Sequence, residues 1–109
     1  MKLDPEIWAA IIGGLFLIAS SSRKVKEGKI VKVDVEFDDV ITSLRITGDF
    51  FMHPEDILED IEKSMLGLKT DVNYEILVNN ICEIVNYHDA QMIGVSPESL
   101  ASVIREALK

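Results

Sequence analysis

The feature of this sequence that most constrains its fold is a change of apolar period between Gly28 and Gly67. Before Gly48, apolar side chains alternate with polar ones, which is typical of two half-buried strands joined by a turn at Asp38 and Asp39. The alternating residues are Val31, Val33, Val35 and Phe37, then Val40, Thr42, Leu44 and Ile46. The pattern predicts an antiparallel β-hairpin with one buried face.

Beyond Gly48 the apolar period becomes that of a helix. Pro54 suits a first helical turn because it has no N–H to leave unpaired, and Glu55 and Asp56 complement the positive end of the helix dipole. Gly67 is placed where a left-handed residue usually closes a helix. The predicted buried stripe consists of Ile57, Leu58, Ile61 and Met65.

Two further helices complete the predicted fold. One runs from Tyr74 to Asn86, and the last begins at Ser96 and Pro97, which supply a cap and a preset φ. Their apolar stripes are Leu77, Val78, Ile81, Ile84 and Val85, then Leu100, Val103, Ile104 and Ala107. The stretch between Gln91 and Val95 fits a brief strand or an extended connector. The prediction is an α+β fold: a hairpin, with or without a third short strand, covered by about three helices.

The segment between Ile7 and Ala19, IWAAIIGGLFLIA, predicts an additional apolar helix at the N-terminus. No charge occurs from Ile7 to Ser22, and as a helix this run spans about 24 Å, against about 30 Å for the hydrocarbon part of a bilayer. Trp8 at one edge and the basic residues that follow favour a membrane span, whereas the short length opposes it. Three interpretations stay open: a membrane anchor, a helix buried against the sheet or a partner, and a leader left from expression.

The serines Ser20, Ser21 and Ser22 are interpreted as a polar linker, which divides the chain into residues 1–22 and 23–109. The net charge is −8, and residues 29–109 contain sixteen acidic but only seven basic side chains. This excess of acid excludes a nucleic-acid partner, because such binding needs basic side chains to neutralise phosphates. Cys82 is the only cysteine, so the chain has no internal disulfide, and a reducing, cytoplasmic setting is expected.

The tetrapeptide GDFF, which begins at Gly48, is the most informative candidate site. Two adjacent aromatic rings at a strand end diverge, so at least one is expected to face outward. The functional interpretation is a contact surface for a larger protein, formed by Gly48, Asp49, Phe50, Phe51, Met52 and His53. The alternative is structural: Phe50 and Phe51 close the two ends of a small core, while Asp49 caps the next turn.

No residue set predicts catalysis or a bound cofactor. His53 and His88 have the chemistry to bind metal, but neither has a second ligand at a suitable spacing. Cys82 lies beside apolar residues of the predicted second helix, which indicates a small buried thiol rather than a nucleophile. The acidic residues of the first helix are best explained as a solvated face.

The sequence resembles the C-terminal accessory domain of lipoate-protein ligases, a domain that some organisms, archaea particularly, make as a separate small subunit. The resemblance covers about residues 25–108 and is most specific in GKIVKV (28–33), ITGDFF (46–51), the helix that ends at Gly67, and the terminal GVSPESLASVIREAL (94–108). Residues 1–22 lie outside the family pattern.

The resemblance implies a non-catalytic accessory role in ATP-dependent activation of lipoate, before its transfer to a lysine of a lipoyl-carrier domain. It implies that the larger catalytic subunit, not this chain, holds lipoate, ATP and magnesium. It also implies an α+β scaffold shared with iron-sulfur assembly proteins. Two other functions remain open: a membrane-tethered interaction module that uses the segment between Ile7 and Ala19, and a sulfur or iron-sulfur carrier that uses Cys82.

Overall fold

The fold is α+β, as predicted. The computed structural model describes residues 17–108, and the expected helix between Ile7 and Ala19 lies almost entirely outside them. The elements, in chain order, are β1 (Leu17–Lys24), β2 (Ile30–Phe37), β3 (Ile41–Gly48), β4 (Phe51–His53), α2 (Ile57–Ser64), α3 (Tyr74–Tyr87), β5 (Gln91–Ile93) and α4 (Pro97–Ala107).

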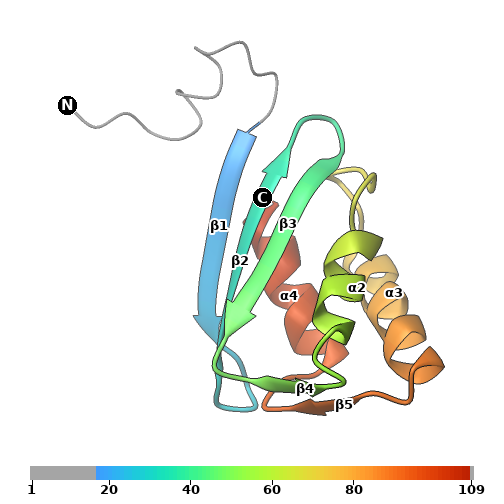
Figure 1. The fold of residues 1–109 in the computed structure, drawn as a ribbon. Helices are drawn as coiled ribbons and strands as arrows, with labels where there is room; N and C mark the ends of the chain where they lie inside the picture. Colours follow the sequence, from blue (N-terminus) through green and yellow to red (C-terminus); the bar gives the residue numbers. More distant parts are fainter. Residues whose placement is uncertain (1–16, 109) are drawn as a thin grey trace.

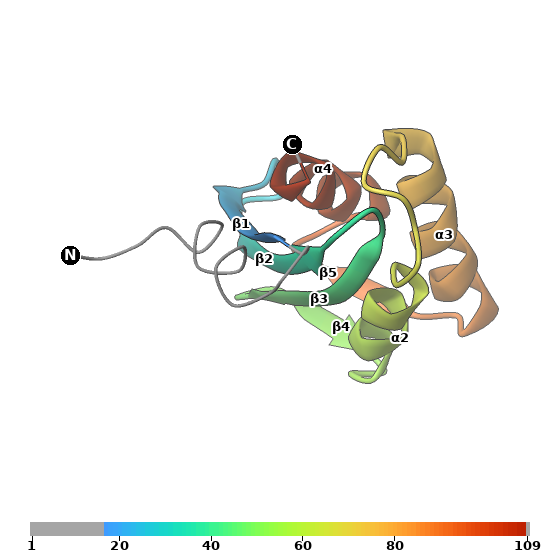
Figure 2. The same cartoon turned by 90° about the horizontal axis from the view of Figure 1, so that it is seen from above.

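Strands β1, β2 and β3 form an antiparallel sheet with β2 in the centre (Figure 1). Helix α4 packs against β1 and β2, and α2 packs against β3. Helix α3 contacts both α2 and α4, and Figure 2 shows it on the far side of α2 from the sheet. The described helices therefore cover one face of the sheet, and the polar side chains of β2 and β3 lie on the other.

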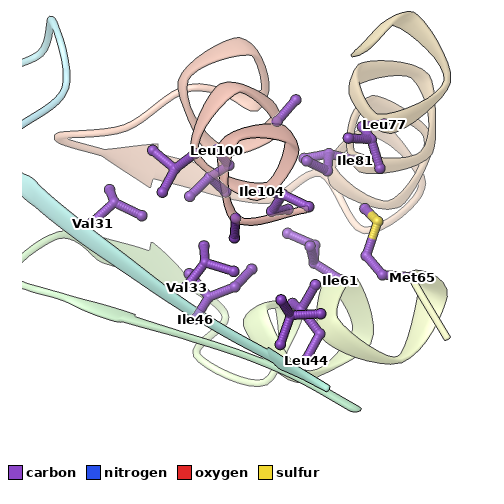
Figure 3. Close-up of a cluster of buried hydrophobic side chains, with 14 of the residues drawn as sticks. Val31, Val33, Leu44, Ile46, Ile61, Met65, Leu77, Ile81, Leu100 and Ile104 are labelled. Carbon is purple, nitrogen blue, oxygen red and sulfur yellow. The ribbon is translucent and has the colours of Figure 1, made fainter. Parts of the chain in front are cut away.

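The core lies between the sheet and the three helices (Figure 3). Val31, Val33 and Ile46 point from the sheet toward the buried stripes of the helices, as the alternation and the helical spacing predict. Ile61 and Ile104 are fully buried between these layers. Complete burial of an aliphatic side chain of this size contributes about 1.5 to 3 kcal/mol, so this cluster is the main source of stability.

The alternation at the start of β3 differs from the prediction because of a β-bulge. Glu36 lies opposite Ser43, whereas Phe37 lies opposite Ile41, so Thr42 is the extra residue on β3. Thr42 is exposed, and its hydroxyl donates to the carbonyl oxygen of Glu36 at 3.0 Å. Ile41 takes the buried position that the sequence pattern assigned to Thr42, because one inserted residue shifts every side chain before it to the other face.

The predicted linker at Ser20 to Ser22 is wrong. These serines lie in the middle of β1, where Ser21 lies opposite Val33, and the strand continues across the expected boundary between Ser22 and Arg23. Leu17 to Ala19, the end of the apolar segment, also belong to this strand and not to a helix. Among residues 17–108, no helix has the length and apolar character needed to span a bilayer.

Side chains cap the N-termini of two of the three described helices, as the sequence predicts for α4. Asn73 caps α3 by accepting from the Ile76 N–H at 2.9 Å, and Ser96 caps α4 by accepting from the Ser99 N–H at 3.1 Å. Helix α2 differs from the prediction, since it begins at Ile57 and Pro54 precedes it in a turn. Gly67 has the expected positive φ of 87°.

Candidate functional site

The residues around GDFF form a second, two-stranded sheet that the sequence did not predict. Strand β4 pairs with β5 in antiparallel fashion at the end of the molecule where β3 finishes (Figure 1). Phe51 lies opposite Ile93, Met52 opposite Met92, and His53 opposite Gln91. Of the two alternatives for the stretch between Gln91 and Val95, a brief strand or an extended connector, the structure has the strand, which pairs with the GDFF segment and not with the hairpin.

The pleat of this ribbon separates its side chains into an inner and an outer face. Met52 is 7% exposed and belongs to the core, whereas Phe51 is 68% exposed and Ile93 is 57% exposed. His53 and Gln91 share the outer face and are exposed as well. We refer to Phe51, His53, Gln91 and Ile93 as the ribbon patch.

The three residues before the ribbon fix its position. A Cβ atom at Gly48 would collide with the carbonyl oxygen of Ile30 and with the Phe50 ring, so only glycine fits there. The Asp49 carboxylate accepts from the Ile30 N–H at 2.8 Å, and the Asp49 N–H donates to the Ile30 carbonyl oxygen at 3.3 Å. Asp49 therefore bonds to the start of β2. The structural alternative expected it to cap the next turn, and this part of the alternative is wrong.

The structure places the six predicted contact residues in different environments. Phe51 and His53 face outward, Phe50 is partly buried against the core, and Met52 is buried. The expectation that one of the two rings faces outward is confirmed for Phe51. A partner-binding role for the segment stays a prediction, and within it the exposed side chains are those of Asp49, Phe51 and His53.

Sequence reasoning missed Gln91 and Ile93. The alternation of Gln91, Met92 and Ile93 is a strand pattern, but three residues are too few to separate a strand from a connector. An aromatic residue opposite a β-branched one is a favourable cross-strand pair, so Phe51 and Ile93 support each other on the ribbon. Large apolar side chains displayed side by side are a feature of contact surfaces.

The two histidines lie on different elements. His53 ends β4, and His88 follows α3, where its Nε2 atom lies 3.6 Å from an Asp60 carboxylate oxygen. Within residues 17–108, no group of three or more His, Cys, Asp or Glu side chains has a metal-binding arrangement.

Cys82 is partly buried on α3. Burial raises the pKa of its thiol, and the nearby charge of Glu98 raises it further. A raised pKa lowers the thiolate fraction near neutral pH, and the thiolate is the reactive form. The environment of Cys82 is therefore that of a packing residue, as the sequence indicated, although its burial is only partial.

Comparison with solved structures gives one informative similarity. It is to a chain from the structure of a bipartite lipoate protein ligase and its E2 lipoyl domain from Thermoplasma acidophilum, with a TM-score of 0.69 and 27% sequence identity. This chain is similar to a component of an archaeal lipoylation system. The similarity covers 83% of this chain and 97% of the other.

The other comparisons give no match. No family model matches the sequence, and no curated protein matches it. The structural similarity agrees with the resemblance to lipoate-protein ligases found in the sequence, and it extends over nearly the whole of the Thermoplasma chain.

Proposed function

We propose that this chain is a non-catalytic accessory subunit of a bipartite lipoate-protein ligase. The observation that carries the proposal is the similarity, in fold and sequence, to a chain of a bipartite ligase system over 97% of that chain. In this role the chain works with a larger catalytic subunit, which holds lipoate, ATP and magnesium, and it is required for lipoate adenylation. Transfer to a lysine of a lipoyl-carrier domain follows, in the cytoplasm.

The ribbon patch is the surface that we assign to the catalytic subunit. Phe51 and Ile93 offer adjacent apolar side chains on a ribbon that Met52 anchors to the core. Asp49 and Gly48 connect this ribbon to the start of β2, so the patch is held rigidly and loses little conformational freedom when it docks. Cys82 is poorly activated as a nucleophile because burial raises the pKa of its thiol, whereas the ribbon patch offers exposed apolar side chains for binding.

Pyrophosphate release by the cognate large subunit tests this function. The assay contains lipoate, ATP and magnesium, with and without this chain, and the chain alone serves as the control. We expect pyrophosphate release to depend on both proteins. An unchanged rate after addition of the chain would contradict the accessory role, and so would turnover by the chain alone.

The same reaction distinguishes a second role that the Thermoplasma structure suggests, since that structure also contains an E2 lipoyl domain. If this chain were the acceptor, its intact mass would increase by one lipoyl group during the assay. As an accessory subunit it keeps its mass, and an added lipoyl-carrier domain gains the group instead.

A further inference from the structure

A groove runs along the free edge of the main sheet, between β3 and α2. Its central hollow measures about 780 Å³ and is lined by residues 43–47 of β3 and by the exposed side of α2. Two flanking hollows of about 190 Å³ each share lining residues with it: one reaches Phe51, and the other reaches Leu66. We refer to the three together as the β3–α2 groove.

Backbone groups of β3 line this groove. The Ile46 N–H donates to the Glu62 carboxylate at 2.7 Å, so the backbone N–H and C=O of Ile46 point away from β2. In an antiparallel strand, the backbone groups of alternate residues point to the same side, so the backbone N–H and C=O of Leu44 also point away from β2. Within residues 17–108, the Leu44 N–H and C=O and the Ile46 C=O have no partner outside the strand. The N-terminal end of this edge is covered, because the Ile41 N–H and C=O bond to Leu68 and Gly67. The three free groups at Leu44 and Ile46 leave the rest of the edge open to an added strand.

The α2 side of the groove is acidic. It carries Glu55, Asp56, Glu59 and Glu62, against a single basic residue, Arg45, in the central hollow. Glu59 pairs with Lys63 at 3.1 Å, but both side chains are largely exposed, so solvent screens that pair. Leu58 lies between the acids, and Phe51 lies at one end of the groove. The groove thus combines free main-chain groups with negative charge and small apolar contacts.

We propose that the β3–α2 groove binds an extended, basic polypeptide segment of a partner protein. The segment adds to the edge of β3 through the Leu44 N–H and C=O and the Ile46 C=O. It sets lysine or arginine side chains against Glu55, Asp56 and Glu59. An extended segment is the form that bonds to a strand edge, and the charge of the groove selects basic side chains. Five residues of β3 span about 14 Å, so four to six residues of the partner fill the groove. This proposal does not depend on a role in lipoylation.

Three capped octapeptides probe the groove against the full chain by amide chemical-shift mapping. The first alternates lysine with threonine, the second alternates glutamate with threonine, and the third is the first with a central threonine replaced by proline. We expect the lysine peptide to shift the resonances of residues 43–47 and 55–62, and to bind more weakly as salt is added. The glutamate peptide should leave these resonances unmoved, and the proline peptide should bind more weakly because it lacks a main-chain donor.

Two matched charge variants locate the site. Glu55→Gln/Glu59→Gln removes two groove acids, and Glu75→Gln/Glu83→Gln removes the same charge from α3, away from the groove. We expect the groove variant to weaken lysine-peptide binding by about fivefold and the α3 variant to change it by less than about twofold, with both melting temperatures close to that of the parent.

Several results would overturn the proposal: no groove shifts with the lysine peptide, equal effects of the two variants, or equal binding of the lysine and proline peptides. Groove resonances that move with protein concentration alone would also overturn it, since the occupant would then be a second copy of this chain.

Discussion

Truncation of Phe51 to alanine tests whether this residue binds a partner or closes one end of the core. Phe51 is 68% exposed, so about a third of its surface is buried in the free protein. Full burial of a phenylalanine contributes about 1.5 to 3 kcal/mol, and a third of that is about 0.5 to 1 kcal/mol. Phe51→Ala should therefore reduce the free energy of unfolding by no more than about 1 kcal/mol.

Association with the catalytic subunit should be affected much more. An aromatic anchor at the centre of an interface is typically worth about 2 kcal/mol or more, which corresponds to about a thirtyfold increase in Kd. The measurements are calorimetric titration with the cognate large subunit and urea unfolding of the same protein samples. A loss of binding without a matching loss of stability is the expected result.

Two control variants define the comparison. Tyr87 is 85% exposed at the end of α3 and does not belong to the ribbon patch, so Tyr87→Ala should change neither quantity. Met52 lies on the buried face of β4, and Met52→Ala should cost about 2 to 4 kcal/mol of stability because it leaves a cavity. If Phe51→Ala lost stability as Met52→Ala does, or bound the large subunit as the parent chain does, the assignment of the ribbon patch would be refuted.

Three further results are expected. Arg105 donates to the carbonyl oxygens of Thr70 and Val72 at 2.8 and 3.0 Å, so Arg105→Ala should lower the free energy of unfolding by about 2 kcal/mol, measured in urea, with Arg105→Lys recovering part of the loss. Burial alone would raise the pKa of Glu27, but hydrogen bonds from its own backbone N–H, Ser96 and Ser99 lower it. A lowered pKa stabilises the fold above the unfolded value of about 4.3, so the stability advantage of the parent over Glu27→Gln should disappear on acidification below that pH, and a constant difference in melting temperature would refute this. Cys82 should react with a thiol reagent more slowly than a free cysteine at pH 8, and a faster reaction would favour the sulfur-carrier interpretation.

The parts of the fold that sequence reasoning predicted are those that local chemistry determines. Helices α3 and α4 have side-chain caps at Asn73 and Ser96, and their apolar spacing is regular over at least three turns. The β2–β3 hairpin has a clear alternation, and its turn is marked by two aspartates. In each case the residues that define the element are close neighbours in the chain.

The parts that were missed depend on contacts between distant residues. Strand β1 contains three consecutive serines, and its conformation comes from pairing with β2 and from the Arg23 contact with Glu106 on α4 at 3.0 Å. The bulge at Thr42 leaves no mark in the composition of β3. Strands β4 and β5 have three residues each and lie far apart in the sequence, so the outer face shared by Phe51 and Ile93 exists only once the chain has folded.

Hydrogen–deuterium exchange on the complex with the cognate catalytic subunit tests the central claim most directly. Amide exchange is compared between the free chain and the complex, in proteolytic peptides that cover β4, β5 and α3. The account predicts slower exchange in residues 49–53 and 91–95 on complex formation, with exchange on α3 unchanged. Unchanged amide exchange in β4 and β5, together with slower exchange in α3, would contradict it.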